Sequence, residues 1–134
     1  MTNAYAYIRT SSAANLGEGK DSVPRQRARI EEFAAANGLQ ITEEFHDGAV
    51  SGEVDVHDRP GFGRLLDAID GDGVRTIVVE DASRFARSMR VSEIGILLLR
   101  ERGVRLLTAT GDDLTDDSDE MKEAFRQIAT VFAQ

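Results

Sequence analysis

Residues 76–90, which read TIVVEDASRFARSMR, indicate both the fold and the place of the chemistry in this chain. The run from Thr76 to Val79 is β-branched and apolar, which is typical of a strand at the centre of a sheet. Two acidic side chains and then three arginines follow it. In open parallel sheets, ligands bind beyond the carboxyl ends of the strands. We therefore expect a central strand that leads into a functional segment.

Strands and helices alternate along the chain on both sides of this stretch. Strands are predicted at residues 4–8, 39–45, 76–79 and 104–108. Apolar residues at helical spacing predict four helices. The first is capped by Ser22 and ends at Asn37-Gly38, the second starts near Pro60, and the third ends at Gly103. The last follows Ser118 and has the apolar face Met121, Phe125, Ile128 and Phe132. This alternation predicts an α/β fold with three layers, a mostly parallel sheet of four to five strands flanked by helices.

The composition excludes several classes of protein. The 134 residues suit one domain with one core. The absence of cysteine excludes disulfides, thiolate zinc sites and a cysteine nucleophile. With two histidines in loop regions and no GxxxxGK[ST] motif, neither a Ser-His-Asp hydrolase nor a P-loop enzyme is favoured. Without a secretory signal or a long apolar run, we expect a cytoplasmic, nucleoid-associated protein.

Charge is unevenly distributed along the chain. The formal net charge of −8 argues against nucleic-acid binding by the chain as a whole, because such binding depends on neutralising phosphates. Residues 1–29, however, carry five basic and two acidic side chains, and residues 83–90 carry three arginines and no acid. Residues 112–123 carry seven acids and one lysine. A concentrated cationic patch can hold an anion even on an acidic protein, although an ordinary acidic surface is the simpler interpretation.

Polar side chains follow each predicted strand and should meet at one edge of the sheet. Arg9 and Ser11 follow the first strand, and with Tyr7 they are spaced two apart, so in extended chain they share one face. An arginine and a hydroxyl on one face can hold and attack a phosphate, although a serine after a strand is more often a turn residue. The segments after the other strands begin with Asp47 and Ser51, with residues 80–87, and with Asp112 and Asp113.

The arginines of residues 83–90 form the second candidate group. Arg84, Arg87 and Arg90 are three apart, so a helical turn would place them near one face. Their guanidinium groups match phosphate oxygens well. Alternatively, Glu80, Asp81 and Glu93 pair with these arginines on the surface.

Residues 47–62 form the third candidate group. Gly48 and Gly52 around Ser51 predict a tight turn with exposed amides suited to an anion. Arg59 precedes the helix at Pro60, where a cation is disfavoured unless an anion joins it. A flexible loop with an arginine on its rim is the alternative.

Taken together, these motifs resemble those of a known family. Tyr-x-Arg-x-Ser at residues 7–11, Asp-x-x-x-Ser-Gly at 47–52, Asp-Arg-Pro-Gly-Phe at 58–62 and Ser-Arg-Phe-Ala-Arg-Ser at 83–88 resemble the catalytic domain of the serine recombinases, which include resolvases, invertases and large serine integrases. The loop at residues 12–21 and the 58–62 element are most similar to the large integrase and transposase branch. The resemblance runs from Tyr7 to the end of the chain.

The resemblance implies a resolvase-like fold and a specific reaction. Ser11 would attack a DNA phosphodiester, forming a 5′-phosphoserine link and releasing a 3′-hydroxyl. Arg9, Arg84 and Arg87 would hold the phosphate, with support from Tyr7, Gln26, Asp47, Ser51, Arg59 and Ser83. Double-stranded DNA and further copies of the chain, as a dimer and then a tetramer, would be the partners, and no metal or cofactor would be required. Residues 1–134 would be a catalytic domain whose last helix is cut short and whose DNA-binding region is absent, so that this part alone would be inactive.

Two other functions stay open at this point. A metal-dependent phosphoryl-transfer domain could use Glu80, Asp81, Asp112 and Asp113, since acids beyond neighbouring strands can bind Mg²⁺. A non-catalytic α/β interaction module would retain the fold alone.

Overall fold

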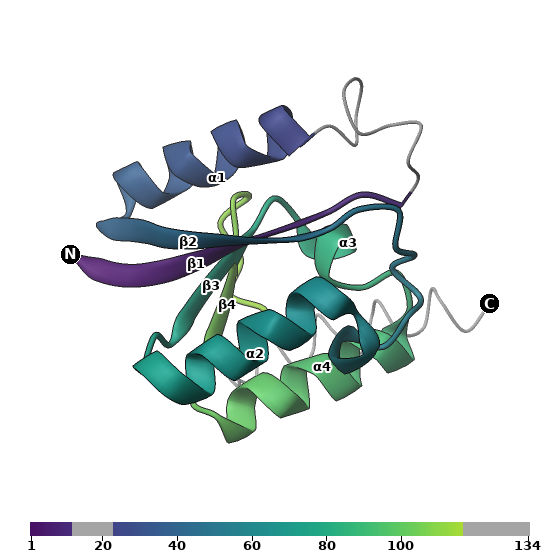
Figure 1. Cartoon of the computed structure of the whole chain (residues 1–134). Coiled ribbons are helices and arrows are strands. Elements are labelled where there is room, and N and C mark those ends of the chain that lie inside the picture. The colour runs from purple at the N-terminus through teal and green to yellow at the C-terminus, as the bar shows by residue number, and fades with distance from the viewer. Residues whose placement is uncertain (12–22, 117–134) are drawn as a thin grey trace.

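The computed structural model describes residues 1–11 and 23–116 of the chain (Figure 1). The elements in these ranges are β1 (Thr2–Arg9), α1 (Val23–Ala36), β2 (Leu39–Asp47), the short 3₁₀ helix η3 (Val56–Asp58), α2 (Pro60–Asp72), β3 (Thr76–Val79), α3 (Ala82–Phe85), α4 (Met89–Glu101) and β4 (Arg105–Thr108). The predicted Ser22 cap, the loop at residues 12–21 and the helix after Ser118 lie outside the described residues.

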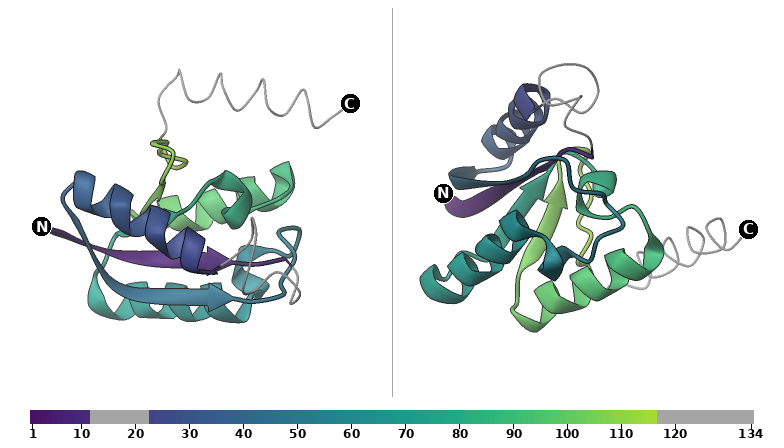
Figure 2. Two further views of the ribbon diagram at one scale, coloured as in Figure 1. Left: turned by 90° about the horizontal axis from the view of Figure 1, so that it is seen from above. Right: turned by 45° about the vertical axis from the view of Figure 1, so that its right-hand side comes forward.

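The described strands form one parallel sheet in the order β2-β1-β3-β4. Helix α1 covers one face of the sheet, and α2 and α4 cover the other (Figures 1 and 2). The chain moves from β1 outward to β2 and then returns past β1 to β3, so the direction of winding reverses between β1 and β3. This arrangement confirms the predicted three-layer α/β fold.

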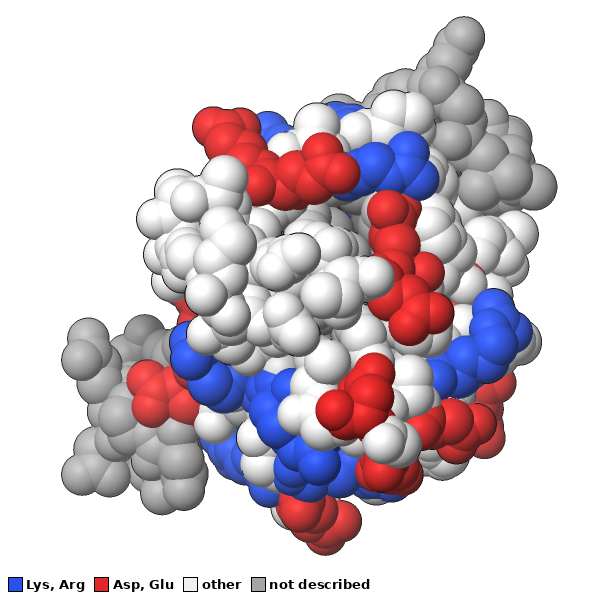
Figure 3. All heavy atoms as spheres, turned by 60° about the vertical axis from the view of Figure 1, so that its left-hand side comes forward, with Lys and Arg blue, Asp and Glu red and all other residues white. Residues whose placement is uncertain are grey.

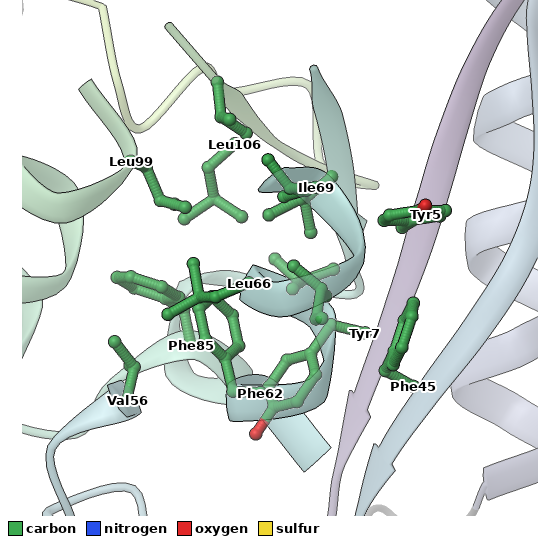
Figure 4. Packing of buried hydrophobic residues seen from close by; sticks show 14 of the residues in the cluster. Tyr5, Tyr7, Phe45, Val56, Phe62, Leu66, Ile69, Phe85, Leu99 and Leu106 are labelled. Atoms are coloured by element: carbon green, nitrogen blue, oxygen red, sulfur yellow. The ribbon is translucent and has the colours of Figure 1, made fainter. Parts of the chain in front are cut away.

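The alternation of side chains in β1 explains why helices pack on both of its faces. Ala4, Ala6 and Ile8 are small or aliphatic and pack with Ile30 of α1. Tyr5 and Tyr7 point to the opposite face, into the larger cluster under α2 and α4 (Figure 4). Because both faces of β1 are covered, it is buried from Ala4 onward and holds the residues that follow it in a fixed place.

The aromatic part of this core lies directly below the carboxyl edge of the sheet, by which we mean the side at which the parallel strands have their carboxyl ends. The Tyr7 and Phe62 rings meet edge to face with their centroids 4.9 Å apart, and Phe85 stands 5.8 Å from Phe62 (Figure 4). These rings join β1, α2 and α3. The segments that begin at this edge therefore rest on a packed base.

The glycines predicted to end helices have the expected backbone conformation. Gly38 after α1 has φ +68° and Gly103 after α4 has φ +69°, a region that residues with a Cβ seldom adopt. Each glycine allows the chain to turn at once toward the next strand. Among the described helices, none is long and apolar enough to cross a membrane.

The structure differs from the predicted elements near the site. The first two strands are longer than expected and reach Arg9 and Asp47, because pairing between β1 and β2 continues to these two residues. The third candidate group, at residues 47–62, contains the short 3₁₀ turn η3. A helix does begin after β3, but α3 ends at Phe85, and Ala86 has an extended backbone before α4 starts.

Candidate functional site

The candidate site lies where β1 and β3 end side by side. At this position the connections of the sheet leave in opposite directions, which opens a crevice at the carboxyl edge of such sheets. Residues 9–11 leave β1 here and residues 80–87 leave β3. The topology thus brings together two of the three candidate groups, and the β2 end, paired with β1 at Arg9 and Asp47, adds the third.

Ser11 is exposed and stands just beyond a firmly held strand end. The preceding Thr10 is buried, and its amide donates to the Asp47 carbonyl (3.0 Å) while its own carbonyl accepts from the Val50 amide (2.9 Å). The Thr10 hydroxyl also accepts from the Ala49 amide (3.1 Å). Three hydrogen bonds to the end of β2 and the segment after it therefore hold Thr10, the residue before Ser11, in place.

Gln26 holds the same strand end from the side of α1. Its side-chain amide donates to the Arg9 carbonyl (3.0 Å), and its carbonyl oxygen accepts from the Arg9 amide (3.3 Å). This pair of bonds resembles that of a neighbouring strand, although a side chain supplies it. Gln26 is fully buried, so it acts on Ser11 through the backbone.

Arg9 joins the segments that follow β2 and β3. Its side chain is fully buried, and it donates to the carbonyls of Val50 (2.8 Å), Ser83 (2.6 Å) and Arg84 (2.9 Å). Each of the three guanidinium nitrogens has a carbonyl partner in these bonds. In this structure Arg9 therefore places a positive charge beneath the site and holds its two sides together.

Arg84 and Arg87 have different surroundings. Arg84 is buried and donates through both Nε (3.0 Å) and Nη2 (2.9 Å) to the Glu80 carboxylate. Arg87 is exposed, and its amide donates to the carbonyl of Gly52 (2.8 Å). A Cβ on Gly52 would overlap the Arg87 side chain and lie 3.0 Å from Nη2 of Arg9, so only glycine fits between these two arginines.

Asp47 supplies the anion expected near Arg59. Its carboxylate accepts from the amides of Gly61 (2.7 Å) and Phe62 (2.9 Å), which caps α2 from a distant part of the chain. It also accepts from the Tyr7 hydroxyl (2.8 Å). Arg59 donates to the Tyr7 hydroxyl (3.3 Å) and is itself buried. The helix start is thus neutralised by a side chain of the protein.

The phenol of Tyr7 stays protonated in these surroundings. Burial raises its pKa well above the ordinary value; the Asp47 carboxylate acts in the same direction and the Arg59 guanidinium opposes both. The neutral hydroxyl can therefore donate to Asp47. Arg59 also donates to the carbonyls of Val54 (3.0 Å) and Gly52 (3.3 Å), which ties the segment after β2 to the aromatic core.

Ser51 and Ser83 make local bonds in their turns. The exposed Ser51 accepts from the Glu53 amide (3.1 Å). Ser83 donates its hydroxyl (2.5 Å) and its amide (2.9 Å) to Asp81, the residue that caps α3. Gly52 is buried and its carbonyl accepts from Arg59 and from the Arg87 amide, so this part of the predicted turn is not exposed.

The expectation that Arg84, Arg87 and Arg90 share one helical face is also wrong. The extended backbone at Ala86 separates α3 from α4 and turns the three side chains apart. Arg90 is exposed and pairs with Asp55 (3.0 Å). Of the alternative that acids pair with these arginines on the surface, the Arg84–Glu80 partnership is confirmed, but the pair is buried, and Asp81 accepts from Ser83.

The four acids of the metal hypothesis are engaged separately. Glu80 faces arginines and Asp81 caps α3. Asp112 and Asp113 accept from Thr110 and Thr115 in the turn after β4. Within residues 1–11 and 23–116, the sole set of three potential metal ligands close enough to share an ion is the largely exposed Asp55, His57 and Asp58. The geometry therefore does not favour the metal-dependent alternative.

The sequence did not single out Thr10, and it gave no sign that Gly52 and Glu80 are buried. Thr10 and Gly52 act through close backbone contacts, which no spacing rule reveals. Glu80 belongs to residues 76–90, but its burial beneath three arginines depends on where α1 packs. The position of Glu80 directly after a buried strand was the available signal.

Comparisons with known proteins were made by family model and by structure. The model described as the resolvase N-terminal domain matches residues 4–134. The catalytic domain of TP901-1 integrase has a TM-score of 0.78 at 21% identity, covering 97% of this chain and 93% of its own. A resolvase family site-specific recombinase from Streptococcus pneumoniae has a TM-score of 0.75 at 25% identity, covering 98% of this chain and 87% of its own.

A third solved structure is more distant but has the same fold. The catalytic domain of ISC1926 TnpA, an IS607-like serine recombinase, has a TM-score of 0.66 at 22% identity, covering 96% of this chain and 80% of its own. A comparison with curated proteins found no match. The agreement of these structures with the described sheet and helices confirms the fold predicted from the sequence.

Proposed function

The chain belongs to the resolvase N-terminal domain family, and from this premise we propose that it is the catalytic domain of a serine recombinase that acts at specific DNA sites. The observation that carries the proposal is that Ser11, an exposed residue, follows a firmly held strand end at the edge where Arg84 and Arg87 also lie. A module that only binds a partner has no need for a hydroxyl in such a place.

In the proposed reaction Ser11 exchanges one phosphodiester for another. The Ser11 Oγ attacks the phosphorus, the bond from phosphorus to the 3′-oxygen breaks, and that oxygen leaves as a 3′-hydroxyl with the proton that Ser11 has lost. The 5′-phosphate stays on the serine until a 3′-hydroxyl of the exchanged strand attacks it and releases Ser11. Because one ester replaces another, the reaction is close to neutral in free energy and consumes no nucleotide.

The arginines at this edge would lower the barrier by stabilising charge. The transition state places additional negative charge on the phosphate oxygens, and guanidinium groups already in place stabilise it without reorganising. One such contact contributes about 3–4 kcal/mol, by analogy with single donors in oxyanion holes. We assign direct phosphate contact to Arg84 and Arg87. Arg9 would contribute its positive charge and join the segments that follow β2 and β3.

The remaining predicted residues would support the site. Gln26 and Asp47 hold the ends of β1 and α2, and Tyr7 and Arg59 connect them to the core. Ser51 and Ser83 lie on the two segments that flank Ser11. We propose double-stranded DNA as the substrate and further copies of the chain as the partners that complete strand exchange.

The chemistry of the DNA ends tests this function. The protein at its full natural length is incubated with a nicked duplex containing a site that it binds in a gel-shift assay, in buffer with EDTA. We expect a 3′-end that a DNA polymerase can extend, and a 5′-end that remains attached to protein until protease digestion. Cleavage that requires Mg²⁺, or that leaves protein on the 3′-end, would contradict the proposal.

A further inference from the structure

Glu80 is the most deeply buried carboxylate at the candidate site. It is the first residue after β3, and its side chain has no exposed surface. Burial of a charged carboxylate is costly unless cations surround it. Arginine side chains surround Glu80, and together they carry more positive charge than is needed to balance one carboxylate.

Three arginines from two helices converge on this one carboxylate. Oε1 accepts from Arg84 of α3, and Oε2 lies 3.0 Å from Nη2 of Arg25 and 3.6 Å from Nε of Arg29, both on α1. Among these four groups positive charge exceeds negative charge. The Arg25 and Arg29 side chains are 35% and 55% exposed, so solvent reaches the outer side of the cluster.

We propose that Glu80 is an internal counter-anion, which occupies this arginine cluster until a phosphodiester of the substrate displaces it from Arg84. The proposal rests on the proposed function, since it assigns the regulation of the same site. Glu80 binds Arg84 through the Nε–Nη2 edge, which is the edge that would otherwise bind two oxygens of a phosphate.

Two consequences follow from this arrangement. Before substrate arrives, Glu80 compensates the buried charge of Arg84 and holds α1 to the end of β3. When a phosphate approaches, Glu80 repels it, so a single phosphodiester binds weakly and the additional contacts of a complete DNA site are needed to overcome the repulsion. The carboxylate thereby favours reaction at sites where many contacts form together.

The variant Glu80→Gln tests the proposal because it removes the charge and keeps the shape. Dimethyl phosphate, a monoanionic phosphodiester, is titrated against the wild-type chain and the variant, with sodium chloride at equal ionic strength as the reference. The melting temperature Tm is followed. We expect the variant to melt at a lower temperature without the probe and to bind it at least about tenfold more tightly than wild type.

Two further variants locate the effect. In Glu44→Gln the same change removes a carboxylate from a surface pair with Arg27, and we expect the response to dimethyl phosphate to stay as in wild type. In Glu80→Gln combined with Arg25→Gln, we expect a weaker response than in Glu80→Gln alone. Equal responses of wild type and Glu80→Gln, or no response in either, would overturn the proposal.

If Glu80→Gln is unfolded in the reference buffer, the same titration is read as recovery of the far-ultraviolet circular dichroism of its helices. Recovery with dimethyl phosphate supports the proposal, and a variant that stays unfolded throughout the series contradicts it. None of these variants changes Ser11. A failure here therefore leaves the test of the DNA ends unaffected, and a failure of that test leaves this result interpretable.

Discussion

At the scale of single residues, the arginines of the carboxyl edge divide into two groups with different partners. Arg9 and Arg59 are buried and donate to backbone carbonyls of neighbouring segments. Arg87 is exposed, whereas Arg84 is held by a carboxylate. The carbonyl partners belong to the backbone and stay in place when an anion enters, so the first group stabilises loops. The second group is the one whose charge a phosphate can use.

Asp47 is the residue whose loss should most affect the stability of this edge. In Asp47→Ala the amides of Gly61 and Phe62 and the Tyr7 hydroxyl lose an acceptor in a buried place. We expect the free energy of unfolding to fall by about 3 kcal/mol, from the lost cap and the unpaired donors. Urea denaturation of wild type and variant at neutral pH measures this change in the free energy of unfolding.

Two comparison variants show whether the buried bonds are responsible. Asp47→Asn keeps an acceptor at a position where asparagine caps well, so it should cost about 1 kcal/mol. Asp72→Ala removes an exposed carboxylate that accepts from Val74, and should change stability by less than about 0.5 kcal/mol. Equal losses for Asp47→Ala and Asp72→Ala would show that Asp47 is not a buried cap.

At the scale of elements, α2 shows how local chemistry determines both ends of a helix. Its start combines Pro60 with a carboxylate from β2, and its end is Gly73 in the left-handed region. Gly71 lies inside the helix, is exposed, and has no neighbouring atom within 4 Å of an added Cβ. The two glycines should therefore respond oppositely to the same substitution.

Gly71→Ala should raise the free energy of unfolding by about 0.5–1 kcal/mol, because alanine restricts the unfolded chain and favours the helix. Gly73→Ala should lower it by about 1 kcal/mol or more, since alanine is strained at φ +80°. Parallel urea denaturation of the two variants checks the signs. A loss of stability in Gly71→Ala would show that α2 ends earlier than described.

Much of the fold at this scale could be predicted from periodicity and end signals. The strand at 76–79, the turn at Gly38 and the helix from Pro60 follow from rules that act over a few residues. The break at Ala86 could not be predicted, because arginines three apart fit a continuous helix equally well. Asp47 as the cap of α2 was also beyond these rules, since 14 residues separate it from Gly61.

At the scale of the whole molecule, the sheet gathers residues that are far apart in the chain. The predicted parallel sheet placed Arg9, Ser11, Asp47 and residues 80–87 at one edge, and they do lie there. Which arginine would face a carboxylate, a carbonyl or solvent depended on packing between α1, β3 and α3, which no local pattern encodes.

The distribution of charge also becomes clear only in the folded molecule. The face toward the amino ends of the strands carries acidic and basic groups around a broad uncharged area (Figure 3). The arginine cluster around Glu80 lies toward the opposite, carboxyl edge. With a net charge of −8 on the chain, this local concentration of arginines, rather than the whole surface, is what can attract a phosphate.

The identity of the attacking atom is the central claim, and peptide mapping tests it most directly. The full-length protein is reacted with the nicked duplex, denatured and digested, and the DNA-linked peptide is sequenced by mass spectrometry. We expect a 5′-phosphate adduct on Ser11 that is lost in Ser11→Ala and retained in Ser92→Ala, which changes a serine of α4 instead. An adduct on another residue, an adduct that persists in Ser11→Ala, or no adduct despite demonstrated binding would contradict the claim.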